Sequence, residues 1–249
     1  MRESENSFPV PFSIEQSHDG YRYSIEPFLL SKFVELAPSA MVLDVGTGCG
    51  IIPLLLLTRE PKLRITAVEI QKSLYEVAVR NIAHHGLASI IKVVQGDFAQ
   101  TGIFRESFDI IISNPPYRKI NSGRINPNQI KAIARHELTL TLSSLLENGC
   151  SLLKPGGRIA LAYPPARLEE VRQTLTRLKL NPGRIRFVHG YSGTNAKIVL
   201  IEAVKEGSTD CLVETPLFIY NKDGSYTQEM RDIYASFNYT GRSHRQRKK

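Results

Sequence analysis

The sequence predicts an α/β protein whose doubly wound, mostly parallel sheet carries an antiparallel edge strand. Along most of the 249 residues, short apolar segments typical of strands alternate with longer segments of helical periodicity, which is the pattern of βαβ units. Apolar residues make up 42% of the chain, enough for one packed core. The sequence shows no internal repeat and no low-complexity linker, which favours a single domain.

The expected elements can be justified one after another along the chain. Residues 24–36 have apolar side chains at helical spacing, and Pro27 is tolerated because it falls in the first helical turn. The helix at 140–153 is expected to begin at Thr139 or Thr141. A series of this kind folds as a Rossmann-like sheet with right-handed crossovers. In order, it comprises strand 40–45, helix 50–60, strand 63–70, helix 71–86, strands 90–97 and 108–113, helix 140–153 and strand 157–164.

The last part of the chain departs from this alternation. A helix at 169–180 is followed by two apolar strands, 183–190 and 197–206, with only a loop between them. Because strands joined by a short loop pair antiparallel, we place an antiparallel pairing at one edge of the sheet.

Residues 1–240 are expected to form the single domain, in which the segment 1–36 caps the ligand site. Residues 241–249 are expected to be a disordered basic tail, which either touches phosphates or only keeps the protein soluble. The formal net charge of +8 favours polyanionic partners. The basic residues of the tail are Arg242, Arg245, Arg247, Lys248 and Lys249.

Cysteine usage and the N-terminus indicate a cytoplasmic protein. Cys49, Cys150 and Cys211 are scattered and lack the spacing of zinc ligands, so we expect free thiols and no metal site. The first residues lack the basic-then-apolar pattern of a secretion signal. The longest apolar run, 51–57, is far shorter than the ~20 residues that a membrane span needs, so no membrane partner is expected.

A glycine-rich loop follows the first strand and opens the next helix. It places Gly46, Gly48 and Gly50 after Asp44, which lies just inside the strand. Glycines permit a tight turn, so a ligand can approach the backbone amides at a helix N-terminus. The dinucleotide fingerprint is G-x-G-x-x-G, but here the third glycine comes one residue early, before Ile51. This spacing argues against a nicotinamide dinucleotide.

Acidic residues also follow the second and third strands. Glu69 stands where an acid can accept the hydroxyls of a ribose. Asp97 could accept an adenine amino group, and Phe98 could cover the adenine ring. The alternative is that Asp44, Glu69 and Asp97 are ordinary strand-end acids. Their common place at the carboxyl edge of successive strands, where open α/β sheets bind ligands, favours a binding site.

The fourth strand ends in the segment Ser113-Asn114-Pro115-Pro116-Tyr117. Proline cannot donate to a sheet ladder and fixes its own φ, so the pair of prolines must end the strand. Each also restricts the residue before it to an extended conformation. The chain is therefore held rigidly at this point.

With these motifs the chain resembles class I S-adenosylmethionine-dependent methyltransferases over most of residues 21–204. The resemblance implies that the glycine loop binds the methionine part of the cofactor, that Glu69 binds its ribose and that Asp97 binds its adenine. In amino-methyltransferases of this fold, [DNS]-P-P-[FYW] is the catalytic motif. The residues that this implies for cofactor binding are Asp44, Gly46, Gly48, Gly50, Glu69 and Asp97, to which we add Phe98 as a cover for the adenine ring. The residues implied for catalysis are Asn114, Pro115, Pro116 and Tyr117.

The chemistry explains why such a motif is needed. An exocyclic amine on an aromatic ring is a poor nucleophile, because its lone pair is delocalised. Acceptors aimed at its hydrogens stabilise the charge that develops on nitrogen during attack. The side-chain carbonyl of Asn114 and the backbone carbonyl of Pro115 are the expected acceptors, and Tyr117 offers a face on which the target base can stack.

The motif alone does not identify the nitrogen, since adenine N6, guanine N2 and glutamine amides are all methylated by such enzymes. The segment after the motif is basic, which suits a phosphate backbone, although it could also be a solvated loop. We take this segment as the candidate substrate-binding region. Its basic residues are Arg118, Lys119, Arg124, Lys131 and Arg135.

The layout as a whole resembles the bacterial tRNA1(Val) adenine-N6 methyltransferase group, apart from Glu26 where related sequences often have Asp. The resemblance implies N6-methylation of an adenine in tRNA, next to the anticodon, with Tyr23 and Ser24 beside the methionine end of the cofactor. For the oligomeric state, which the sequence does not identify, a monomer is favoured. Methylation of a protein glutamine, methylation of guanine N2 in ribosomal RNA, and RNA binding without catalysis remain alternatives. The segments that carry this resemblance are 20–30, 43–50, 113–117, 135–137 and 216–230.

Overall fold

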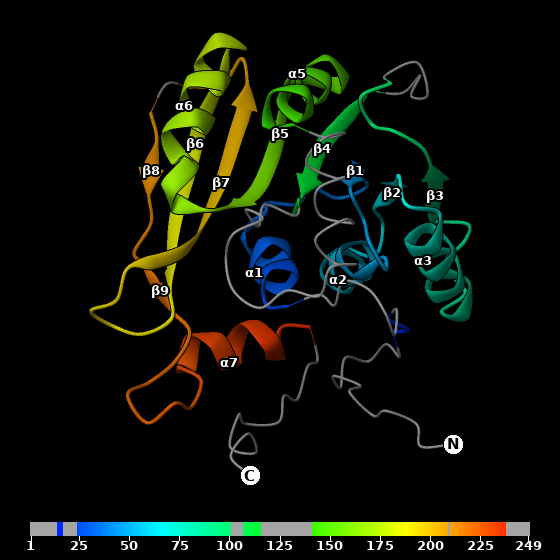
Figure 1. Ribbon diagram of the computed structural model, residues 1–249. Coiled ribbons are helices and arrows are strands. Elements are labelled where there is room, and N and C mark those ends of the chain that lie inside the picture. Colours follow the sequence, from blue (N-terminus) through cyan, green and yellow to red (C-terminus); the bar gives the residue numbers. More distant parts are fainter. Residues whose placement is uncertain (1–13, 17–23, 101–106, 116–140, 209, 238–249) are drawn as a thin grey trace, which may run out of the picture.

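A nine-stranded sheet forms the centre of the protein (Figure 1). The computed structural model describes residues 14–16, 24–100, 107–115, 141–208 and 210–237. The strands lie in the order β3-β2-β1-β4-β5-β7-β6-β8, and β9 also pairs with β6. Only β7 runs against the other strands of the described sheet. The strands are β1 (Met41–Val45), β2 (Arg64–Glu69), β3 (Ile91–Gln95), β4 (Phe108–Ser113), β5 (Leu153–Tyr163), β6 (Leu180–His189), β7 (Ala196–Lys205), β8 (Leu212–Val213) and β9 (Leu217–Phe218).

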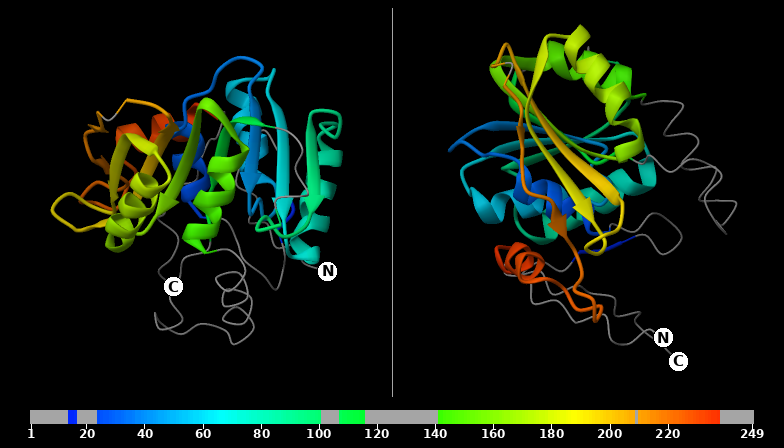
Figure 2. Two further views of the ribbon diagram at one scale, coloured as in Figure 1. Left: turned by 90° about the horizontal axis from the view of Figure 1, so that it is seen from above. Right: turned by 90° about the vertical axis from the view of Figure 1, so that its left-hand side faces the viewer.

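Helices cover both faces of this sheet (Figure 2). Helices α1, α2, α3 and α7 share one apolar core with Val42 of β1, whereas α5 and α6 share the other with Leu43 and Val45. Because side chains alternate along a strand, Asp44 is turned toward the α2 layer. The helices are α1 (Glu26–Phe33), α2 (Ile51–Arg59), α3 (Lys72–His84), α5 (Leu142–Leu152), α6 (Leu168–Arg177) and α7 (Gln228–Ala235), and a 3-10 turn, η2 (Pro165–Arg167), precedes α6.

The series of strands and helices expected between residues 24 and 206 is confirmed, with shifts at some of the element ends. Of the two candidate caps for α5, Thr141 is the one that serves, because its hydroxyl accepts the backbone N–H of Ser144 at 3.1 Å. None of the helices in the described part of the chain has the length and apolar character needed to cross a membrane.

The antiparallel strand lies one place further inside the sheet than we expected. β6 and β7 do pair antiparallel, but β7 also pairs with β5 along residues 158–163, so it lies between the two. The edge is occupied by β8 and β9, which are too short to show a periodic pattern in sequence. Residues 241–249 and much of the segment 1–36 lie outside the described residues, so the division into one domain and a tail stays a prediction.

A buried ion-pair network joins α1 to the antiparallel part of the sheet. The carboxylate of Glu202 on β7 is 2% exposed and lies 3.3 Å from both Arg158 of β5 and Arg184 of β6. It also accepts the backbone N–H of Glu35 at 3.2 Å. Arg184 donates in addition to the carbonyl of Phe33, the last residue of α1, at 2.6 Å. One carboxylate therefore fixes the end of α1 against three strands.

We predict that Glu202→Ala lowers the free energy of unfolding by about 2 kcal/mol, because it leaves two guanidinium groups without their shared buried partner. Urea denaturation measures this change. Glu169→Ala is the control, since it removes an exposed pair with Arg172 on α6 and exposed pairs contribute little. Equal losses in the two variants would contradict the role assigned to Glu202.

Candidate active site

The centre of the candidate site is the end of β1, which has a neighbouring strand on each side. Val45, the last residue of β1, pairs with Val68 of β2 and with Ser113 of β4. Since these strands are parallel, the segments that follow them leave the sheet at one edge. The glycine loop, Glu69 and Asn114 therefore start from adjacent positions.

The glycine loop is tied to β2 by its backbone. The amides of Gly46 and Thr47 donate to the carbonyl of Val68 at 2.9 and 3.1 Å. Gly46 and Gly48 have φ values of +74° and +59°, which other residues rarely adopt, and a Cβ built on either would meet no atom within 4 Å. Gly50 differs, because its Cβ would lie 3.5 Å from that of Ala78 on α3. The first two glycines thus face open space, whereas a side chain at the third, whose φ is +83°, would be in ordinary contact with α3.

Glu69 holds this loop in place. Its carboxylate is 1% exposed and accepts the backbone N–H groups of Gly48 and Gln71, each at 2.9 Å. A carboxylate can accept more than two hydrogen bonds. Shaping the loop and accepting ribose hydroxyls, the role predicted from the sequence, are therefore compatible.

Asp44 is fully buried without a hydrogen bond to its carboxylate. Neither of its side-chain oxygens has a hydrogen-bond partner among the described residues, and neither does the hydroxyl of Thr47. Burial raises the pKa of Asp44 to about 7; Thr47 lies near enough to lower this pKa somewhat, and the charge of Glu69 raises it. A buried carboxylate in this state lacks a donor or a cation, which a ligand could supply.

Asp97 and Phe98 follow β3 as expected but differ in exposure. Asp97 is half-buried, and its carboxylate accepts the backbone N–H of Ala99 at 2.8 Å. Phe98 is 3% exposed and belongs to the core shared with Leu43 and Val45. Its ring therefore packs beneath the strand ends in this structure, and its contact with an adenine ring stays a prediction.

Ser113 joins two strand ends at the candidate site, although the sequence analysis gave it no role. Its side chain is fully buried, and its hydroxyl donates to the carbonyl of Val45 at 2.8 Å. This bond joins the end of β4 to the end of β1, directly before Asn114 and Pro115, which are half-buried. A polar residue directly after the buried apolar run 110–112 was the available signal.

Several predicted residues lie outside the described part of the chain. Ser24 is described: it is exposed, and its hydroxyl donates to the carboxylate of Glu26 at the start of α1. Those that lie outside are Tyr23, Pro116, Tyr117, Arg118, Lys119, Arg124, Lys131 and Arg135.

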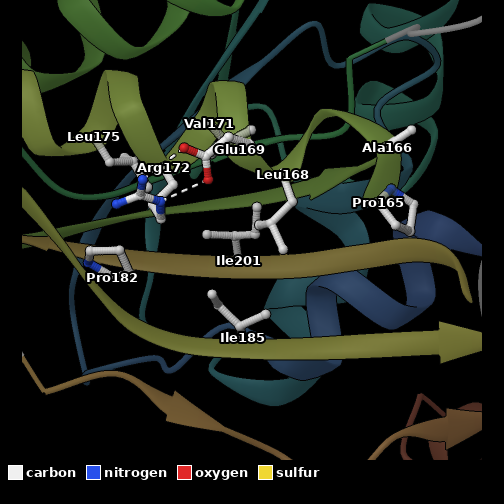
Figure 3. A pocket seen from close by; sticks show the side chains of 10 residues that line it. All are labelled: Pro165, Ala166, Leu168, Glu169, Val171, Arg172, Leu175, Pro182, Ile185 and Ile201. Atoms are coloured by element: carbon white, nitrogen blue, oxygen red, sulfur yellow. Dashed lines mark hydrogen bonds and ion pairs between the residues drawn. The ribbon is translucent and has the colours of Figure 1, made fainter.

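A pocket of about 340 Å³ lies elsewhere, between α6 and the strands β6 and β7 (Figure 3). Its walls are mostly apolar, and the ion pair of Glu169 with Arg172 belongs to its lining. Of the predicted site residues that the structure describes, none lines it. No group of three or more potential metal-ligating side chains occurs among the described residues.

The strand-end site fits the methionine part of S-adenosylmethionine. Gly46 and Gly48 leave room against their backbone, and Asp44 and Thr47 present buried polar atoms that lack partners. An ammonium group would supply the charge and the donors that the carboxylate of Asp44 lacks. The residues present are therefore suited to this cofactor.

We predict that Gly48→Ala and Gly86→Ala lower stability equally but differ in cofactor binding. Both glycines have a positive φ, +59° and +68°, and an added Cβ meets nothing at either. Alanine in this backbone region should cost each about 1 kcal/mol. Only Gly48→Ala should weaken S-adenosylmethionine binding, because its added methyl group occupies the open space beside the glycine loop where we expect the cofactor to bind. Calorimetry that found the same affinity in both variants would exclude the loop as the binding surface.

We predict that Asp44→Asn stabilises the ligand-free protein near pH 8 and much less near pH 5. A raised pKa means that the native state keeps a proton that the unfolded state has lost. The contribution of Asp44 to stability is therefore full below about pH 4 and is lost as the pH rises through about 7. Asparagine carries no such charge, so its gain near pH 8 should be roughly 2–4 kcal/mol. Thermal unfolding at both pH values checks this, and a gain independent of pH would contradict it.

Comparison with known proteins identifies the family. A family model described as methyltransferase small domain matches residues 26–165. A Porphyromonas gingivalis protein named tRNA1(Val) (adenine(37)-N6)-methyltransferase is 32% identical over 199 residues, 77% of this chain and 77% of that protein. A protein of the same name from Vibrio cholerae is 30% identical over 227 residues, 90% of this chain and 92% of that protein.

Solved structures agree on the fold. The crystal structure of a predicted O-methyltransferase from Agrobacterium tumefaciens matches with a TM-score of 0.67 and 19% identity, covering 85% of this chain and 96% of that one. At this identity the likeness concerns the fold alone. Taken with the sequence matches, it shows that the chain belongs to the methyltransferase small domain family, an S-adenosylmethionine-dependent family with the class I methyltransferase fold.

Proposed function

We propose that this protein transfers a methyl group from S-adenosylmethionine to the N6 atom of an adenine in tRNA, next to the anticodon. The observation that carries the proposal is the pairing of Val45 with Ser113, reinforced by the 2.8 Å bond between them. It sets the Asn114-Pro115 segment beside the glycine loop. The names of the relatives support tRNA and the adenine N6 as the target.

The residues after β4 would act on the target amine. The carbonyl oxygens of Asn114 and Pro115 accept hydrogen bonds from the two N–H groups of this amine. These bonds stabilise the positive charge that develops on nitrogen. Bound S-adenosylmethionine supplies an electrophilic methyl carbon to that nitrogen. Because the bond from Ser113 fixes where this segment starts, positioning contributes much of the rate.

Other parts of the chain complete the proposal. Asp44, the glycine loop, Glu69 and Asp97 hold the cofactor, and the segment 1–36, with Tyr23 and Ser24, closes over its methionine end. The basic residues of 118–135 contact the phosphates of the RNA. The protein acts as a monomer in the cytoplasm.

We predict that the purified protein transfers a tritiated methyl group from S-adenosylmethionine to tRNA that carries no modifications. Digestion to nucleosides should place the label in N6-methyladenosine, because the acceptor groups suit an exocyclic amine. Transfer of label to ribosomal RNA or to a protein glutamine instead of tRNA would support S-adenosylmethionine as the methyl donor but contradict tRNA as the substrate.

Asn114→Ala is the matched control for this experiment. It should lower kcat by at least about 100-fold, the usual cost of removing one group that stabilises transition-state charge. Cofactor affinity should stay unchanged, since Asn114 is not among the residues proposed to hold the cofactor. A protein that only binds RNA would show no transfer at all and no effect of this variant.

A further inference from the structure

The hairpin formed by β6 and β7 extends past the edge at which β4 ends. Ser113 pairs with Leu161, Leu161 with Ile201, and Ile201 with Ile185, so these residues lie at one level of the sheet. β6 continues four residues beyond Ile185, to His189. At the usual rise of a strand, the hairpin therefore extends about 13 Å beyond the level of Ser113. It lies on the side of β4 opposite β1, β2 and β3, with β5 in between.

The loop at the tip of this hairpin is held in one conformation. Thr194 accepts the backbone N–H of Tyr191 at 3.3 Å through its hydroxyl, and this hydroxyl also donates to the carbonyl of Tyr191 at 2.7 Å. The amide of Thr194 adds a bond to the same carbonyl at 3.2 Å. The segment after β9 is hydrogen-bonded to the hairpin, because the backbone N–H of Tyr220 donates to the carbonyl of Gly190 at 2.9 Å. Tyr191 is thus preorganised although it is 42% exposed.

Tyr191 is the exposed end of a chain of aromatic rings that runs into the core. The ring centroid of Tyr191 lies 5.3 Å from that of Tyr220. The Tyr220 ring in turn stacks on that of Tyr226, with a centroid distance of 5.3 Å and an interplanar angle of 16°. The Tyr226 ring packs edge-on against Tyr234 of α7, and Tyr234 packs edge-on against Phe28 of α1, with ring-centroid distances of 5.3 and 5.1 Å. Figure 1 shows that β9 lies near the end of β6 and that the chain then continues into α7. The exposed ring is therefore backed by rigid packing.

The surroundings of Tyr191 suit a nucleic acid better than a protein. The neighbouring residues 192–195 are exposed and small or polar, so the ring is not part of an apolar patch of the kind that a protein interface needs. Lys197, near the start of β7, and Lys222, two residues after Tyr220, are exposed. Asp223, the acid of this region, accepts hydrogen bonds from Ser225. The other strongly exposed apolar residues on this part of the sheet, Leu212 and Val213, lie on β8, level with Arg184 and Ile185.

We propose that Tyr191 is a stacking platform for an unpaired base of the RNA substrate that lies outside the candidate active site. The inference rests on the proposed function, which requires an adenine to leave its loop and enter the site. Bases that are unstacked in this way are commonly received by aromatic side chains, with cations beside them for the phosphates. Tyr191, Lys197 and Lys222 provide this combination at the edge of the sheet where the Asn114-Pro115 segment begins.

The test measures RNA affinity by fluorescence anisotropy with two labelled probes: an unmodified anticodon stem-loop and a blunt duplex of the same length. Tyr191→Ala should raise the Kd for the stem-loop about tenfold and leave that for the duplex unchanged, because only the loop offers unpaired bases. Tyr191→Phe keeps the ring and should bind within about twofold of the wild type. Leu212→Ala, which removes an exposed apolar side chain of β8 that is level with Arg184 and not with the hairpin tip, is the matched control and should bind normally. Thr194→Val should also weaken stem-loop binding, since it loosens the loop.

The outcomes separate this inference from the proposed function. If the wild type methylates tRNA at N6 while Tyr191→Ala binds the stem-loop as tightly as Leu212→Ala, the platform is wrong and the function stands. Equal losses for stem-loop and duplex would also overturn it, since stacking cannot act on paired bases. If the wild type neither binds nor methylates tRNA, the proposed function fails and the platform fails with it. Thermal unfolding and cofactor affinity, expected to be unchanged in all variants, confirm that the fold is intact.

Discussion

The organisation of the site depends on the pairing of β1 with a parallel strand on each side. Val45 lies between Val68 and Ser113, so three segments must leave the sheet at the same level. Backbone bonds from Gly46 and Thr47 to Val68, and the side-chain bond from Ser113 to Val45, make this arrangement rigid. A cofactor loop and an acceptor segment can then be adjacent although they are far apart in sequence.

This arrangement has an electrostatic cost in the ligand-free protein. Asp44 and Glu69 are both buried at the edge where the loop turns. Glu69 is compensated by two backbone amides, whereas Asp44 has no such bond and its pKa is raised to about 7. The role proposed for Asp44 accounts for this cost, because a cationic ligand bound there would supply the charge and donors that the carboxylate lacks.

Sequence alone predicted most of the parallel half of the fold, because long apolar strands and amphipathic helices carry their own periodicity. It also placed the glycine loop, Glu69 and Asn114 at one edge, because parallel strands share an edge. It could not predict β8, β9 or the inner position of β7, since two-residue strands have no period and strand order depends on tertiary pairing. For the same reason it could not assign Ser113, whose partner is 68 residues away, or show that Phe98 is buried.

The position of β4 explains why the acceptor motif follows this strand and no other. On one side of β4 lie β1, β2 and β3, whose ends carry the residues suited to the cofactor. On the other side, beyond β5, the β6–β7 hairpin continues past the edge to His189 and Tyr191. The proposed reaction joins a small cofactor and a large RNA, which would be held on opposite sides of the reacting atoms. β4 lies between these two sides of the sheet, so a rigid segment at its end can face both.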